Sequence, residues 1–175
     1  MKKDVMIDFE TFGNGKNACI CQVGACYFDR KTGEIYQMFS ANIDARSAVD
    51  SGAEMDADTV YWWLSQDKAA IESITKQPQK PIREVFNELN EFLKDADCIW
   101  SHATFDFVIM NETFKRLKIK PLYSYRSARD IRTLLDLSGV DYKAFTREGI
   151  HHEGLADAMH QVKYCQAAFT VLEAE

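Results

Sequence analysis

The most constraining feature of the sequence is a pair of carboxylates inside an otherwise apolar strand. Residues 4–10 alternate as a β-strand does, so Asp8 and Glu10 leave the same face. The rest of the stretch is mainly Val, Met, Ile and Phe, which predicts a central, buried strand. Two like charges there repel each other, and desolvation adds to the cost. A divalent cation resolves both problems, and oxygen ligands suit Mg²⁺ or Mn²⁺.

Taken alone, this pair has a second interpretation, in which the strand ends at Phe9 and Glu10 lies in solvent.

Two more apolar stretches follow, at 18–28 and 34–43, joined by a turn that contains Gly33. The chain is therefore expected to open with three consecutive antiparallel strands.

Helices predominate in the rest of the chain. The spacing of apolar residues predicts helices at 56–66, 81–94, 104–118, 127–137 and 154–172. A short strand is expected at 98–100, and residues 139–149 have no periodicity and are expected to form a loop. Trp62 and Trp63 cannot both face inward from one helix, and Trp63 is the one expected in the core.

Composition restricts the class of protein. The chain has 175 residues, which suits a single domain, 1–175, with one core. Acidic residues outnumber basic ones 27 to 21, giving a net charge of −6, which argues against binding nucleic acid through a broad basic surface. An enzyme that holds one strand end through metals stays compatible with this charge.

Three further features of the sequence predict the cellular compartment of the protein. The five cysteines are odd in number and include no C-x-x-C pair, so reduced core cysteines are expected, not a disulfide framework or a zinc knuckle. No apolar run is long enough to span a bilayer, and no signal-peptide pattern precedes the first strand. A cytoplasmic protein without a membrane partner is expected.

Two more acidic residues stand at predicted helix starts. Asp106 follows the short strand, and Asp157 lies in the first turn of the last helix. The helix dipole favours acidic residues at such positions, so neither means much alone. His152 precedes Asp157 by five residues, and either member of the pair His151–His152 also fits a surface loop.

The combination resembles a known family. The segment Asp8-Phe9-Glu10-Thr11 resembles the first motif of the DEDD exonucleases, and Phe105-Asp106 resembles the second. The spacing of His152 and Asp157 resembles the third motif in its "h" form. Residues 58–64 and 129–133 look like the phage and prophage branch related to mycobacterial 3′–5′ exoribonucleases, so the similarity covers most of the chain. Ser101-His102 departs from the Gly-Asn-like turn expected before the second motif.

The resemblance implies a ribonuclease H-like α/β fold, with a mixed five-stranded sheet flanked by helices: three antiparallel strands first, then parallel additions. It implies a DEDDh 3′–5′ exonuclease with two Mg²⁺ or Mn²⁺ ions per site, yielding nucleoside 5′-monophosphates. One ion would be held by Asp8, Glu10 and Asp157, and the other by Asp8 and the scissile phosphate, with Asp106. His152 would act as the general base, with His151 as the open alternative.

The substrate side is defined more loosely. By the same resemblance Thr11 would contact the terminal sugar. Phe12 or Phe105 would stack on a base, with core packing as the alternative. One arginine of the group Arg126, Arg129 and Arg132 would pair with Asp130 or a substrate phosphate, with Arg129 as the candidate chosen. The partner implied is a nucleic-acid 3′ end, single-stranded or overhanging, with RNA or DNA undecided. A homodimer and, for a phage-encoded chain, a host-cytoplasm location also follow. The alternatives are a ribonuclease H-like endonuclease and an inactive binding module on the same fold.

Overall fold

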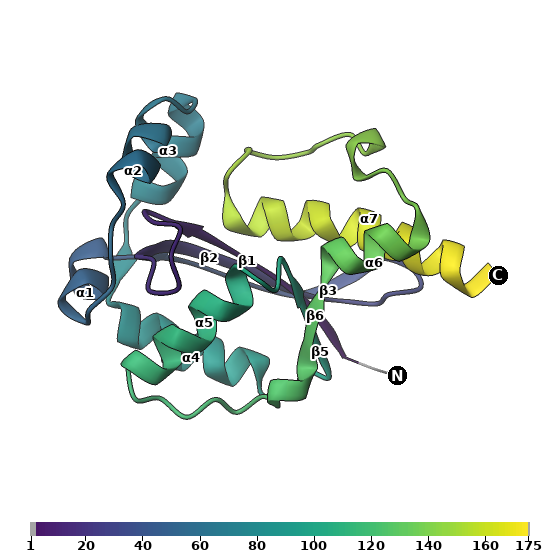
Figure 1. The fold of residues 1–175 in the computed structure, drawn as a ribbon, viewed down its shortest axis with the longest axis horizontal. Helices are drawn as coiled ribbons and strands as arrows, with labels where there is room; N and C mark the ends of the chain where they lie inside the picture. The colour runs from purple at the N-terminus through teal and green to yellow at the C-terminus, as the bar shows by residue number, and fades with distance from the viewer. Residues whose placement is uncertain (1–2, 175) are drawn as a thin grey trace.

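A mixed six-stranded sheet with helices on both faces forms the centre of the computed structural model, which describes residues 3–174 (Figure 1). The strand order is β4-β3-β2-β1-β5-β6. The first three strands are antiparallel, and β4, β5 and β6 each pair in parallel with a neighbour. The prediction of a mixed α/β sheet is confirmed, but the predicted number of strands was one too few. The strands are β1 Asp4–Thr11, β2 Ile20–Phe28, β3 Ile35–Ile43, β4 Gln79–Lys80, β5 Cys98–Ser101 and β6 Ala128–Asp130.

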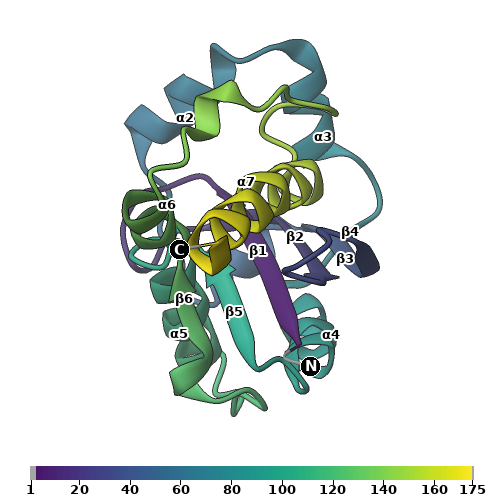
Figure 2. The same ribbon diagram turned by 90° about the vertical axis from the view of Figure 1, so that its right-hand side faces the viewer.

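Helices α4 and α5 cover one face of the sheet, and α6 and α7 cover the other (Figures 1 and 2). Helices α2 and α3 stand at the end of the sheet where α7 begins (Figure 1). No helix among residues 3–174 combines the length and the apolar character that crossing a membrane would require. The helices are α1 Ala45–Asp50, α2 Ala57–Leu64, α3 Lys68–Thr75, α4 Ile82–Leu93, α5 Asp106–Arg116, α6 Ile131–Ser138 and α7 Gly154–Ala174.

The alternation of β1 divides its side chains between the two layers. Val5 and Ile7 are fully buried under α4 and α5, while Met6 belongs to the core under α6 and α7. Asp8 and Glu10 continue the Met6 face, which places both carboxylates toward α7. The period-2 pattern of the sequence therefore decides which helices can complete a site with them.

The helix predicted at 127–137 begins later than expected. Its first residues form β6, which pairs with β5 at the edge of the sheet. The side chain of Asp130 accepts a hydrogen bond from the Thr133 amide (2.9 Å), which caps α6 and ends the extended segment. The two-residue strand β4 and the short helices α1 and α3 were also not predicted.

Two further expectations of the fold, and the expected burial of the cysteines, are confirmed. Residues 139–149 form an irregular connection apart from a 3₁₀ turn at Tyr142–Ala144. Trp63 is 3% exposed and donates from Nε1 to the Thr11 carbonyl (2.8 Å), whereas Trp62 is 42% exposed. The five cysteines are all free and buried.

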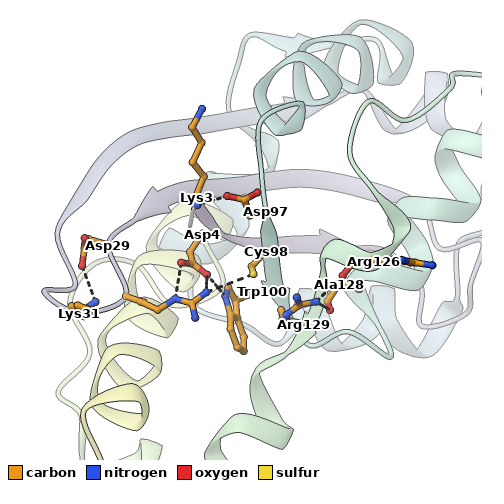
Figure 3. Close-up of polar contacts among 11 residues, drawn as sticks. Lys3, Asp4, Asp29, Lys31, Asp97, Cys98, Trp100, Arg126, Ala128 and Arg129 are labelled. Atoms are coloured by element: carbon orange, nitrogen blue, oxygen red, sulfur yellow. Dashed lines mark hydrogen bonds and ion pairs between the residues drawn. The ribbon is translucent and has the colours of Figure 1, made fainter. Parts of the chain in front are cut away.

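A partly buried ion pair stabilises the start of β1, and its carboxylate, Asp4, is labelled in Figure 3. Arg30 donates to both oxygens of Asp4, at 2.9 and 2.6 Å, and Trp100 Nε1 donates to the same carboxylate at 2.8 Å. Arg30 also lies over the Phe169 ring of α7, 4.5 Å from its centroid. The charge of Asp4 is therefore fully partnered, which is typical of a structural role.

The start of α7 lies directly against β2, with no side chain between them. A Cβ at Gly24 would lie 2.0 Å from the Leu155 amide nitrogen and 2.1 Å from the Gly154 carbonyl carbon. Gln22, also on β2, accepts a hydrogen bond from the Gly154 amide at Oε1 (2.7 Å) and donates to the Ser73 carbonyl of α3 (3.1 Å). Because Gly24 pairs with Asp8, this contact sets how closely α7 approaches the β1 carboxylates.

Gly24→Ala is predicted to destabilise the protein by about 1–3 kcal/mol or more, because the added methyl must push backbone away from backbone. Gly15→Ala is the matched control, since a Cβ at Gly15 meets nothing within 4 Å. Urea unfolding of both variants measures the difference. Unfolding free energies within about 0.5 kcal/mol of each other would show that α7 is not held this closely.

Candidate active site

Three elements bring four carboxylates into one cavity of about 620 Å³. Asp8 and Glu10 come from β1, Asp106 from the start of α5 and Asp157 from the first turn of α7. These are the four acidic residues singled out in the sequence, and 149 residues separate the first from the last. The parallel pairing of β5 with β1 and the close approach of α7 to β2 produce the convergence.

Asp106 is held in place by backbone amides. Its Oδ1 accepts from the Phe9 amide of β1 (3.2 Å), and its Oδ2 accepts from the His102 amide (3.1 Å). The side chain is almost fully buried. Both hydrogen bonds favour the charged carboxylate, and together they orient it toward the end of β1.

The carboxylates form two adjacent groups with histidines. Ligand atoms of Asp8, Asp106 and His102 all lie within 4.8 Å of one another. The same holds for the ligand atoms of Glu10, Asp157 and His152. Two oxygens on opposite sides of one Mg²⁺ would be about 4.2 Å apart, so a small contraction brings either group to binding distance.

The electrostatics of the cavity favour a bound cation. Burial raises the pKa of Asp8 to about 7, opposed by a hydrogen bond from Gln161 and by the charge of Arg147. Burial, followed by the charges of Asp8 and Asp106, raises the pKa of Glu10 to about 9. The pKa of Asp106 is also raised well above its usual range, first by burial and then by Asp8. Hard oxygen donors whose ionisation is disfavoured by burial and mutual repulsion fit a divalent cation such as Mg²⁺ or Mn²⁺, which offsets both costs.

His152 lines the cavity, and the adjacent His151 does not. The backbone of His152 is left-handed, with φ of 60°, a conformation that non-glycine residues rarely adopt and that often marks functional sites. Its ring packs edge-on against Trp62, with centroids 4.7 Å apart. Burial, then the neighbouring charges of His151 and Arg147, lower the pKa of His152 to about 4. The ring is therefore neutral near pH 7 and can accept a proton.

The structure places only one of the four residues predicted to contact substrate in the lining of the cavity. Phe105 lines the cavity, whereas Thr11, Phe12 and Arg129 are not among its lining residues. The Thr11 hydroxyl donates to the Gly13 carbonyl (2.6 Å), and Phe12 packs against Trp63, with centroids 6.4 Å apart. Arg129 donates to the backbone carbonyls of its own β6 region.

Sequence reasoning missed several residues of the cavity. Gln161 of α7 is 5% exposed and donates to Asp8 Oδ1 (2.7 Å). Its spacing of four from Asp157 places both on one face of a helix, and this was the available signal. Arg147 forms an ion pair with Asp157 from the 139–153 connection, where no periodicity marks it. Of the arginines Arg126, Arg129 and Arg132 considered from the sequence, Arg132 lines the cavity and the chosen Arg129 does not.

Solved structures of exonucleases share this fold. Exonuclease I from Methylocaldum szegediense superposes with a TM-score of 0.71 at 14% identity, covering 95% of this chain and 40% of that one. The zinc-bound form of an E. coli Exonuclease I–ssDNA complex gives a TM-score of 0.64 at 15% identity, covering 99% and 41%. E. coli Exonuclease I with a dA16 oligonucleotide gives 0.66 at 15%, covering 97% and 41%. This chain thus spans about two fifths of those chains, and the likeness establishes the ribonuclease H-like fold.

Sequence comparison establishes the family. No curated protein sequence matches the chain. The profile of the 3′–5′ exoribonuclease Rv2179c-like domain matches residues 3–169, which is nearly the whole chain. The expected exonuclease family is confirmed, and the phage branch stays a prediction. The chain belongs to the Rv2179c-like family of 3′–5′ exoribonuclease domains.

Proposed function

We propose that the chain is a two-metal 3′–5′ exonuclease that removes nucleoside 5′-monophosphates from single-stranded or overhanging 3′ ends. The observation that carries the proposal is the convergence of Asp8, Glu10, Asp106 and Asp157 in one cavity beside a neutral histidine. Membership of an exoribonuclease domain family supports the same reaction.

The four carboxylates are proposed as metal ligands, and Gln161 as the residue that orients one of them. Asp8, Glu10 and Asp157 would hold one cation, and Asp8 with Asp106 the other. Bound divalent cations supply charge stabilisation to the attacking and leaving oxygens of the phosphodiester. Gln161 orients Asp8 through its hydrogen bond to Oδ1.

The general base in this proposal is His152. A neutral imidazole can accept the proton of the attacking water, and the pKa lowered to about 4 keeps the ring neutral while making it a weaker base than an ordinary histidine. The edge-on contact with Trp62 restricts where the ring can lie. His151 is more exposed and lies outside the cavity lining, so it is assigned no role.

The substrate is proposed to be a single strand. Phe105 lines the cavity and packs partly against the core, and its ring is the proposed platform for a terminal base, a contact that tolerates any sequence. The family is described as exoribonucleases, while the E. coli Exonuclease I complexes hold single-stranded DNA. RNA and DNA are therefore both substrates to compare. The single-domain organisation, the cytoplasmic location and the homodimer stay predictions.

The proposal predicts a descending ladder of products from 5′-labelled single-stranded RNA or DNA in Mg²⁺ or Mn²⁺, lost in chelator and in Asp8→Ala. His152→Ala is expected to slow cleavage by about 10²–10⁴-fold, the usual contribution of a general base. His151→Ala is the matched control and should stay within a few-fold of the wild type. A ladder that survives chelator, or equal slowing in both histidine variants, would contradict the mechanism.

A 3′-blocked oligonucleotide separates the exonuclease from the endonuclease alternative. The exonuclease should leave the blocked strand intact while degrading its unblocked copy. Internal cuts in both strands would instead identify an endonuclease.

Mn²⁺ affinity is predicted to rise with pH between 6 and 8. In the metal-free protein the raised pKa values of Asp8, about 7, and Glu10, about 9, mean that both carboxyls hold protons which a cation must displace. The apparent Kd should fall by up to about tenfold per pH unit for each proton released. Calorimetry in buffers of different ionisation enthalpy measures both the Kd and the protons released. An affinity that is independent of pH, with no proton release, would show that the carboxyls are already charged.

A further inference from the structure

The segment between α6 and α7 places a positively charged side chain, Arg147, beside the carboxylates. Arg147 Nη2 forms an ion pair with Asp157 Oδ1, and the side chain lines the cavity. Burial lowers the pKa of Arg147, and the charges of Asp8 and Glu10 oppose that shift. The mechanism above gives this residue no task.

The guanidinium of Arg147 has N–H donors that are not used in hydrogen bonds. Arg147 Nε is buried without a partner among the described residues, while about a third of the side chain (30%) is exposed. Arginine carries five N–H donors in a planar fork that matches a phosphate in two-point contact. Arg147 therefore lies between the interior of the site and the solvent, with donors left for an incoming anion.

A cation at Asp157 and the guanidinium compete for the same carboxylate. Both are positive, so they repel each other at the short distances of this cavity. Occupation of Asp157 by a divalent ion weakens the hold of that residue on Arg147. The freed guanidinium then needs another anion.

A second ion pair on the same segment gives a matched control. Glu148, the next residue, pairs with Lys163 of α7 at 2.8 Å, and Glu148 is largely exposed. Exposed ion pairs of this kind contribute little to stability. Lys163 is not among the residues that line the active cavity, so this contact does not depend on the state of the carboxylates.

We infer that Arg147 is a substrate-binding residue: its guanidinium holds Asp157 in the metal-free site and moves to a phosphate of the nucleic-acid strand once a divalent cation takes that carboxylate. This inference rests on the proposed function. It requires Arg147 to oppose metal binding and to favour strand binding, and a merely structural arginine would not have these opposite effects.

The test measures binding, not turnover, on wild-type protein and Arg147→Gln. Calorimetry with Mn²⁺ alone should show Kd lowered about fivefold or more in the variant, because the competing cation is gone. Anisotropy of a 5′-fluorescein single-stranded 12-mer in Ca²⁺ should show binding weakened about tenfold. The slope of log K against log salt should become shallower by about 0.7, the value for one phosphate contact on a single strand.

Two further variants separate the guanidinium from the segment that carries it. Arg147→Lys keeps the charge and should recover part of the strand affinity while leaving Mn²⁺ affinity near that of the wild type. Lys163→Gln loosens the same segment and should leave both affinities near wild type. If Lys163→Gln reproduces the effects of Arg147→Gln, positioning of the segment explains them and the inference is overturned.

The remaining outcomes distinguish this inference from the proposed function. A wild-type protein that binds neither Mn²⁺ nor the oligonucleotide would overturn both. A wild-type protein that binds both, with strand affinity and salt slope unchanged in Arg147→Gln, would overturn the role of Arg147 alone.

Discussion

The contact between Gly24 and Gly154 brings the first turn of α7 against β2, and the composition of the site depends on it. A methyl group at Gly24 would overlap the α7 backbone, so the helix can lie this close only where side chains are absent. Gln22 fixes the same helix end through the Gly154 amide. The carboxylate of Asp157 and the amide of Gln161 reach β1 because α7 starts here.

Two aspartates on one face of β1 show how the surroundings separate a structural charge from a functional one. Asp4 is paired with Arg30 through two hydrogen bonds and receives a third from Trp100. Asp8 receives one hydrogen bond, from Gln161, and lies beside two other buried carboxylates. The first carboxylate is stabilised by a permanent cationic partner, whereas burial and neighbouring carboxyls disfavour ionisation of the second, as expected of a site that binds cations.

Much of the fold could be predicted because apolar periodicity records which face each element buries. The three opening strands and the helices α4, α5 and α7 have long patterns of this kind. The three residues of β6 were mistaken for the start of a helix because no loop separates them from α6. Asp130 is the last residue of β6, and its side chain caps α6. Short elements such as α1, α3 and β4 carry too few residues for a period to show.

The site was predictable only where its residues form local motifs. The four carboxylates and His152 stand in recognisable spacings, and the structure brings them into one cavity. Gln161 shares a helix face with Asp157, but its partner Asp8 lies 153 residues away, and spacing does not encode that contact. Arg147 comes from a connection without periodicity, so no pattern marks it.

The central claim is that these carboxylates hold divalent cations, and anomalous diffraction from crystals grown with Mn²⁺ tests it most directly. We expect manganese peaks inside the cavity, with Asp8 touching both ions of a pair and Arg147 displaced from Asp157. Peaks confined to other surfaces, with Arg147 still bound to Asp157 at saturating Mn²⁺, would contradict the account.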